Sequence, residues 1–188
     1  MIAIIDNGGQ YTHLIGRCVR ELGFEARTFQ NKSSFEAVKE ADAIILSGGP
    51  GSAYKDDFGI CERAVMQAFE KGMPLLGICM GHQLIAHYLG GSVGRGENAE
   101  YGVVEISVDE ERVLFSGVPR RFRAWVSHFD EVKKMPKGFV KTAHSEKCGV
   151  EAMEHEKKPI FGVQFHPEVW HTEHGEKIIA NFLSLMKK

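Results

Sequence analysis

Cys79 lies in a pattern that is typical of a catalytic nucleophile. Residues 77–81 read G-x-C-x-G, between the apolar run PLLGI and the helical pattern HQLIAHYL. Glycines on both sides permit a sharp turn between strand and helix, a nucleophile elbow that raises the side chain out of the sheet. The start of the helix also favours a thiolate. We therefore predict that Cys79 is a nucleophile, whereas Cys18, Cys61 and Cys148, which lack an elbow, are expected to be structural and reduced.

His166 is the expected proton carrier for this nucleophile. It follows the apolar pattern KPIFGVQF and precedes Pro167, which biases His166 toward an extended conformation. Side chains two residues apart in an extended segment project to the same side, so Glu168 can orient the imidazole and stabilise its positive charge. The sequence therefore predicts a triad of Cys79, His166 and Glu168.

A negative oxygen formed by nucleophilic attack needs hydrogen-bond donors, and a glycine-rich loop can supply them. The segment SGGPG at residues 47–51 follows the apolar run AIIL. We predict that the backbone N–H groups of Gly49 and Met80 form an oxyanion hole. The loop lacks the Gly-Lys-Ser/Thr of a Walker phosphate loop, and GGSVGRG at residues 90–96, which we expect to be a flexible loop, lacks the context of a dinucleotide site.

The histidines near the C-terminus allow a metal site as an alternative interpretation. His166, His171 and His174 are close in sequence, but their spacing brings no thiolate ligand and no HExxH pattern. Pro167 also interrupts any helix that they could share. We therefore predict that the chain binds no metal.

The elements that must position these residues alternate in the first half of the chain. Short β-branched runs are followed by patterns in which apolar residues recur every three or four positions. Such alternation predicts a parallel sheet covered by helices. The expected strands are IAIID, EARTF, AIILS and PLLGIC, and the expected helices are THLIGRCVREL, SFEAVKEA, CERAVMQAFEKG and HQLIAHYLG.

From about Val103 onward the pattern changes. VVEISV, FRAWVSH, FVKTAH and KPIFGVQF follow one another with little helix between them, and EKIIANFLSLMKK closes the chain. This order predicts strands added to one edge of the sheet and then a terminal helix. We find no repeat, low-complexity segment or linker, so we expect a single domain over residues 1–188.

Composition argues against several kinds of partner. A net charge of -2 with 26% charged residues provides no strong field for nucleic acid or an acidic membrane, so we expect neither. The N-terminus has no basic region or cleavage site of a signal peptide, and no apolar run is long enough to cross a bilayer. We therefore expect a cytoplasmic location.

Three motifs, SGGPGS, GICMGHQLIA and GVQFHPEV, occur in this order and resemble those of the class I, or triad, glutamine amidotransferases. IDNGGQY, AWVSHFDEV and VEAMEHEKKPIFGVQFHPEVWHTEHGE resemble in particular the amidotransferase part of GMP synthetases. The resemblance covers essentially the whole chain. It implies a three-layer α/β fold with a flavodoxin-like, mostly parallel central sheet flanked by helices, and with antiparallel edge strands.

Carried over residue by residue, the resemblance implies the roles given above for the triad and the oxyanion hole. It also implies glutamine-holding groups that spacing alone does not indicate. These are the Gly51 backbone, Gln83, and the segment formed by Ser127, His128, Phe129 and Asp130, which is expected to face the α-amino and α-carboxylate groups.

The chain ends at Lys188 without the ATP-pyrophosphatase region that follows the amidotransferase part of two-domain GMP synthetases. The resemblance therefore implies a separate ATP-pyrophosphatase subunit that uses the ammonia to convert XMP to GMP. We expect a transient heterodimer that ATP and XMP promote. ATP and Mg²⁺ are expected in that subunit, and no cofactor is expected in this chain.

Three other functions stay open at this point. The chain could serve a different ammonia acceptor, it could be a stand-alone cysteine hydrolase or peptidase built on the same elbow, or it could be a silent regulatory subunit that binds glutamine or a synthetase. The intact Cys79, His166 and Glu168 argue against the silent subunit.

Overall fold

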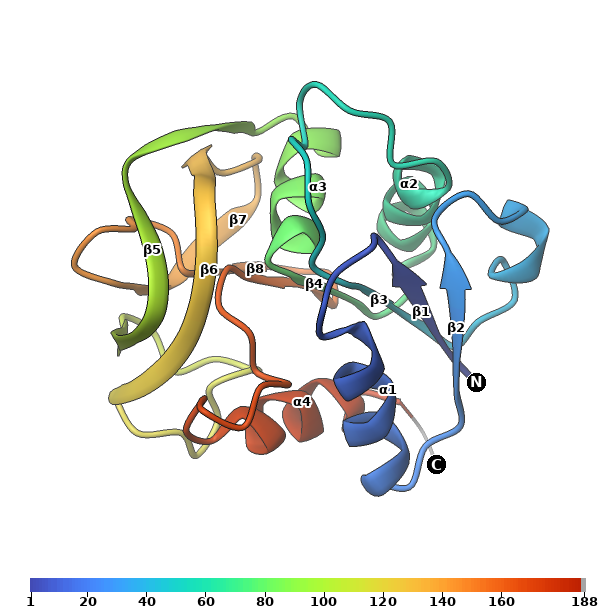
Figure 1. Cartoon of the computed structure of the whole chain (residues 1–188). Coiled ribbons are helices and arrows are strands. Elements are labelled where there is room, and N and C mark those ends of the chain that lie inside the picture. Colours follow the sequence, from blue (N-terminus) through green and yellow to red (C-terminus); the bar gives the residue numbers. More distant parts are fainter. Residues whose placement is uncertain (187–188) are drawn as a thin grey trace.

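The computed structural model describes residues 1–186, apart from the side chain of Asn98, and shows a central sheet with helices on both faces (Figure 1). Within that range the sheet has nine strands in the order β2-β1-β3-β4-β9-β8-β7-β5-β6. The strands are β1 (Ile2–Asp6), β2 (Ala26–Gln30), β3 (Ala43–Leu46), β4 (Leu75–Ile78), β5 (Ser92–Val108), β6 (Arg121–Lys134), β7 (Phe139–His144), β8 (Ala152–His155) and β9 (Ile160–Val163).

The strands from β2 to β9 in this order are parallel, which gives the flavodoxin-like half of the sheet. Strands β3, β4 and β9 are buried along their whole length, as expected of parallel strands that are covered on both faces. The predicted fold class is therefore confirmed. The prediction that KPIFGVQF forms an added edge strand is wrong, because β9 pairs in parallel with β4 and lies inside the sheet.

Two helices cover each face of the parallel half (Figure 1). α1 (Thr12–Glu21) and α4 (Gly175–Leu183) pack on one face, and α2 (Cys61–Lys71) and α3 (Met80–Tyr88) pack on the other. Alternate residues of β1 serve the two cores, since Ile4 belongs to the α1 side and Ile5 to the α2 side.

The predicted helix SFEAVKEA is a single 3₁₀ turn, η1 (Phe35–Ala37). Phe35 is its buried side chain, and Val38 and Ala41, which follow the turn, are buried at the same spacing of three residues. That spacing fits the three residues per turn of a 3₁₀ helix better than the α-helical period. A segment this short also gains little from helix propensity, so its buried anchors determine its shape.

The second half of the sheet is antiparallel and is dominated by the long, curved pair β5 and β6 (Figure 1). The expectation of a flexible loop at GGSVGRG is wrong, because β5 begins at Ser92 and Gly94 pairs with Glu131. Hydrogen bonding to β6 overrides the weak strand preference of glycine there. Strand β8 was not expected, and it joins β9 to β7.

The carboxyl ends of β1, β3, β4 and β9 lie side by side at one edge of the parallel half. Ligands bind at this edge in open α/β sheets. The segments that contain the predicted loop, nucleophile and base follow β3, β4 and β9 directly. No helix within residues 1–186 is long and apolar enough to span a membrane.

Candidate active site

Cys79 forms the turn between β4 and α3, with φ 53° and ψ −104°. A residue other than glycine in such a conformation costs about 1–3 kcal/mol, and this strain is typical of functional sites. A Cβ on Gly77 would come within 2.4 Å of the Gly81 backbone, and a Cβ on Gly81 would come within 2.3 Å of the Leu46 carbonyl oxygen. The two glycines therefore permit the close approach of strand and helix that the elbow prediction requires.

His166 follows the end of β9 and faces the elbow. Ile78 and Val163 are register partners in β4 and β9, so the residues that follow them leave the sheet side by side. A Cβ placed on Gly48 would lie 3.0 Å from His166 Cε1 and 3.4 Å from Cys79 Cβ. The structure thus brings the predicted nucleophile and base to the same point beside the glycine-rich loop.

His166 is held both at its backbone and at its imidazole ring. Its backbone N–H donates to the carbonyl of Trp125 on β6 (2.9 Å), and Nδ1 lies 2.8 Å from Glu168 Oε1. The side chains of His166 and Glu168 are 6% and 1% exposed, so water screens this pair little. Burial opposes a positive charge on His166, but Glu168 and the neighbouring Cys79 outweigh it and hold the pKa of His166 well above its ordinary value.

The loop after β3 is held tightly against the end of β1. The backbone N–H of Asn7 donates to Ser47 Oγ (2.9 Å), and Asn7 Nδ2 donates to the Ser47 carbonyl (3.0 Å). A Cβ on Gly49 would lie 2.2 Å from the Asn7 carbonyl oxygen, so only glycine fits there without a shift of the loop. This packing fixes the loop beside Cys79, where an oxyanion hole would be needed.

The residues expected to hold glutamine meet around a cavity of about 590 Å³ beside Cys79. Gln83 is 3% exposed, and its Nε2 donates to the Asp130 carbonyl (2.8 Å). Among the described residues its Oε1 has no hydrogen-bond partner and could accept one from a ligand. The lining includes all the expected oxyanion and glutamine-binding residues, namely Gly49, Gly51, Met80, Gln83, Ser127, His128, Phe129 and Asp130.

Two further residues contact the predicted site and were not expected from sequence. Gln164 Nε2 lies 3.6 Å from Cys79 Sγ, and Gln164 Oε1 accepts from Gln83 Nε2 (3.1 Å). The ring of Tyr11 packs edge-on against His166, with centroids 5.1 Å apart. Gln164 lies two residues before His166, so the spacing argument that selected Glu168 could also have found it.

The three histidines considered as metal ligands contact different groups. His166 contacts Glu168, while His171 packs against the rings of Trp125 and Trp170. His174 precedes the first turn of α4 in a left-handed conformation. These contacts favour separate structural and chemical roles over a shared ion.

The four thiols differ in their surroundings, which leads to a first testable prediction. Burial raises the pKa of Cys18 to about 11 and that of Cys61 to about 12, and it also raises the pKa of Cys148. A thiol with a pKa near 11 is only about 0.1% thiolate at pH 8. Cys79 lines a cavity that His166 also lines, so a reagent can reach its sulfur next to a general base.

We therefore expect iodoacetamide at pH 8 to alkylate Cys79 at least about tenfold faster than the other three thiols. Peptide mapping by mass spectrometry over a time course measures the four rates. Modification of Cys18 before Cys79 would contradict the assignment of the reactive thiol.

Comparison with known proteins gives a consistent family for the whole described chain. The family model for class-I glutamine amidotransferases matches residues 3–186. A subunit of the glutamine-hydrolysing GMP synthase of Pyrococcus abyssi is 52% identical over 187 residues, which cover 98% of each chain. The protein of the same name from Methanocaldococcus jannaschii is 50% identical over 97% of this chain and 95% of its own length.

Solved structures agree with these relatives. A Thermoplasma acidophilum structure described as a GMP synthase subunit matches with a TM-score of 0.90 and 34% identity, over 98% of this chain and 92% of that one. A glutamine amidotransferase from Thermotoga maritima matches with a TM-score of 0.80 and 24% identity, over 98% of this chain and 80% of that one. The second match indicates likeness of fold.

Proposed function

Because this chain belongs to the class-I glutamine amidotransferase family, we propose that it is the glutamine-hydrolysing subunit of a two-subunit GMP synthase. The observation that carries the proposal is that Cys79 and His166 meet beside a cavity lined by the residues expected to hold glutamine. Relatives that are about half identical over nearly their whole length are named as subunits of the glutamine-hydrolysing GMP synthase, which supports GMP synthesis as the destination of the ammonia.

The first half of the proposed reaction is acyl transfer to the thiolate. Cys79 Sγ attacks the side-chain amide carbon of glutamine, and the carbonyl oxygen becomes negative as the tetrahedral intermediate forms. The amide carbon–nitrogen bond then breaks, and the His166 imidazolium gives its proton to the departing nitrogen. Ammonia leaves, and a γ-glutamyl thioester remains on Cys79.

The second half is hydrolysis of that thioester. Neutral His166 removes a proton from water, whose oxygen attacks the thioester carbon. The carbon–sulfur bond breaks, glutamate leaves, and the thiolate–imidazolium pair is restored. Glu168 stabilises the imidazolium and fixes the ring orientation in both halves, which fits its 2.8 Å contact with Nδ1.

The backbone N–H groups of Gly49 and Met80 are the proposed donors to the tetrahedral oxygen. Both residues line the cavity that contains Cys79. Met80 opens α3, so its N–H has no acceptor within the helix and the positive end of the helix dipole faces the site. One such donor is worth about 3–4 kcal/mol of the activation barrier.

The proposed partner is an ATP-pyrophosphatase subunit that activates XMP with ATP and Mg²⁺ and takes up the ammonia. This assigns no cofactor to the present chain and a cytoplasmic location to the complex. We propose a transient heterodimer that forms when ATP and XMP occupy the partner. Such coupling would keep the chain from hydrolysing glutamine when no acceptor is ready.

The test combines the purified chain with a candidate ATP-pyrophosphatase subunit, glutamine, ATP and XMP. We expect GMP to form, and we expect glutamate release to rise about tenfold or more when the partner and both nucleotides are added. A glutamate rate that stays unchanged would contradict the coupling. Glutamine hydrolysis without GMP formation, in the presence of a partner that makes GMP from ammonium, would point to another acceptor.

A further inference from the structure

A group of buried ionisable side chains borders the glutamine cavity, with Glu100 and His128 in its lining, and the proposed mechanism does not use it. His128 on β6 has a side chain that is 3% exposed, and its Nε2 lies 3.2 Å from Glu100 Oε2 and 3.8 Å from Glu151 Oε1. Glu100 comes from β5, and Glu151 directly precedes β8. Three separated segments therefore bring two carboxyl groups to one nitrogen of one ring.

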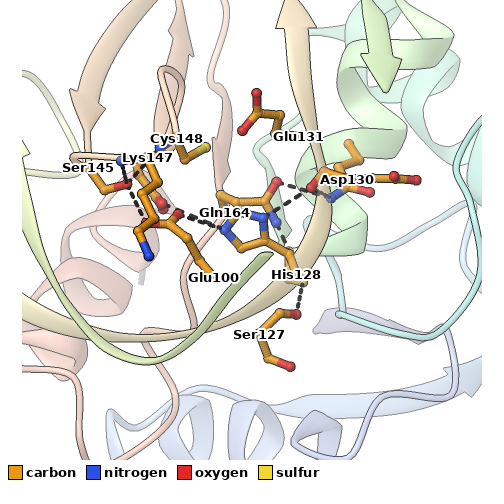
Figure 2. A network of polar contacts seen from close by, with 12 residues as sticks. Glu100, Ser127, His128, Asp130, Glu131, Ser145, Lys147, Cys148 and Gln164 are labelled. Carbon is orange, nitrogen blue, oxygen red and sulfur yellow. Dashed lines mark hydrogen bonds and ion pairs between the residues drawn. The ribbon is translucent and has the colours of Figure 1, made fainter. Parts of the chain in front are cut away.

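Both ring nitrogens of His128 face acceptors. Nδ1 lies 3.1 Å from the carbonyl oxygen of Asp130, which can only accept a hydrogen bond, so Nδ1 must donate. Nε2 lies within ion-pair distance of the Glu100 carboxylate, 3.2 Å, without meeting hydrogen-bond geometry. Figure 2 shows the ring between Glu100 on one side and Asp130 on the other. A ring that donates from Nδ1 and faces two carboxyl groups with Nε2 is stabilised as an imidazolium.

The charges of the group support this protonation state. Burial alone would lower the pKa of His128, but Glu100 and Glu151 raise it to about 10. Contacts with His128 and Ser145 outweigh the burial of Glu100 and lower its pKa, so Glu100 is the principal counter-ion. Burial raises the pKa of Glu151 to about 7.

Other titratable groups surround the ring without replacing Glu100 as its partner. The sulfur of Cys148 lies within 4.8 Å of a ring nitrogen of His128 and of one carboxylate oxygen of each glutamate. His82 on α3 is fully buried, and burial lowers its pKa to about 3, so it stays neutral beside His128. Cys79 lines the same cavity as His128, and a thiolate there would also favour the imidazolium.

The cluster is linked to the reactive thiol through the Asp130 carbonyl. This oxygen accepts from His128 Nδ1 and from Gln83 Nε2, and Gln83 in turn contacts Gln164, which contacts Cys79 Sγ. At the other end of the same segment, the Ser127 carbonyl lies 3.8 Å from Cys79 Sγ. The ring of His128 therefore holds the backbone that borders the cavity, through the Asp130 carbonyl.

We propose that His128, held as an imidazolium by Glu100 with Glu151 beside it, is a positioning residue that fixes the backbone of residues 127–130 for glutamine binding. The inference rests on the proposed function and specifies how the same site is built. It also changes the role expected for His128, which lines the cavity together with Ser127 and Phe129 but whose Nε2 faces the buried carboxyl groups.

The kinetic consequence follows from geometry. A ligand-binding segment displaced by about 1 Å loses on the order of 100-fold, and a residue that acts only on the bound substrate's position changes KM more than the chemistry of the thiol. His128→Asn retains a side-chain donor for the Asp130 carbonyl but removes the charge. We expect it to raise the KM for glutamine about 10-fold to 100-fold and to change kcat by less than about threefold.

The experiment measures KM and kcat for glutamine in the complex with the partner subunit, ATP and XMP. His144→Asn is the matched control, because His144 also pairs with a carboxylate, Asp109 Oδ1 at 2.8 Å, but lies outside the cavity. We expect the control to leave KM unchanged. Glu100→Gln, which keeps the side-chain volume, should raise KM several-fold and decides the question if His128→Asn does not fold.

Nuclear magnetic resonance of the ¹⁵N-labelled wild-type chain gives a readout that does not depend on activity. We expect both ring nitrogens of His128 to be protonated at pH 8, and we expect Glu100→Gln to lower the pH at which the ring loses its proton. A neutral His128 ring in the wild type would overturn the proposal. So would a wild-type chain that holds one metal ion when His128→Asn holds none.

The outcomes separate this inference from the proposed function. If the wild-type complex releases no glutamate from glutamine, the proposed function fails whatever His128 does. If the wild type is active and His128→Asn and Glu100→Gln both keep its KM, the positioning role fails alone.

Discussion

Replacing Cys79 with alanine is expected to lower glutamine-dependent GMP formation by about 10⁴-fold or more, because the remaining groups cannot form the thioester. The thiol is 7% exposed at a strained turn, and among the described residues it is the one cysteine that lines the cavities with His166 and Gln83. Ammonium chloride should restore GMP formation in the same complex, because the acceptor chemistry takes place in the partner. Glutamate, GMP and ammonia are measured in parallel.

Cys18→Ala is the matched control for this substitution. Cys18 lies on α1 and lines a different cavity. We expect it to keep the wild-type rate with glutamine. If Cys79→Ala retained glutamine-dependent activity, the covalent mechanism would be wrong. If ammonium failed to rescue it, the loss would reflect a damaged complex.

The elbow at Cys79 and the contact between His166 and Glu168 could be predicted because each depends on residues that are close together in the sequence. A turn between a buried strand and a helix needs glycines at fixed positions, and the close contacts of Gly77 and Gly81 account for this pattern. His166 and Glu168 meet as predicted, although through a turn at residues 167–168 and not through the extended segment that was expected. These constraints act within a few residues, so the sequence records them directly.

The position of β9 in the sheet could not be predicted in the same way. Its pattern indicates a strand, but its neighbours β4 and β8 are decided by packing between segments far apart in the chain. The 3₁₀ turn at Phe35 and the pairing of Gly94 in β5 are also tertiary effects that override local preference.

The buried cluster of Glu100, His128 and Glu151 illustrates the same limit for side chains. Glu100, His128 and Glu151 belong to different strands or connections, and no motif spacing joins them. Each residue read alone indicates an exposed polar side chain, since charged residues are seldom fully buried unless paired. The pairing of β5 with β6, in which Glu100 and His128 are register partners, and the approach of the segment before β8 bring them together.

Replacing His166 with glutamine is expected to lower glutamine hydrolysis by about 10³-fold to 10⁵-fold, since it removes both the acid and the base of the proposed mechanism. The same change leaves the Glu168 carboxylate, 1% exposed, without its cation. An uncompensated buried charge costs about 3–5 kcal/mol of unfolding free energy. The variant should therefore lose both activity and stability, and a second substitution can separate the two losses.

The double variant with His166→Gln and Glu168→Gln separates them, because it removes the unpaired carboxylate but restores no base. We expect it to recover most of the unfolding free energy of the wild type at pH 8 and none of the activity. A double variant as unstable as the single one would show that burial of Glu168 is not the cause.

The pH dependence of stability has a definite sign. The pKa of His166 is higher in the folded chain than its ordinary value, so the folded state holds the proton more tightly than the unfolded state. The resulting stabilisation is complete below about pH 6.5 and is lost as pH rises through the raised pKa. Urea unfolding of the wild type should show a decline in this alkaline range that is smaller in the double variant. Equal slopes would mean that the His166–Glu168 pair does not hold its proton in the folded chain, and the thiolate–imidazolium pair proposed for catalysis would lose its physical basis.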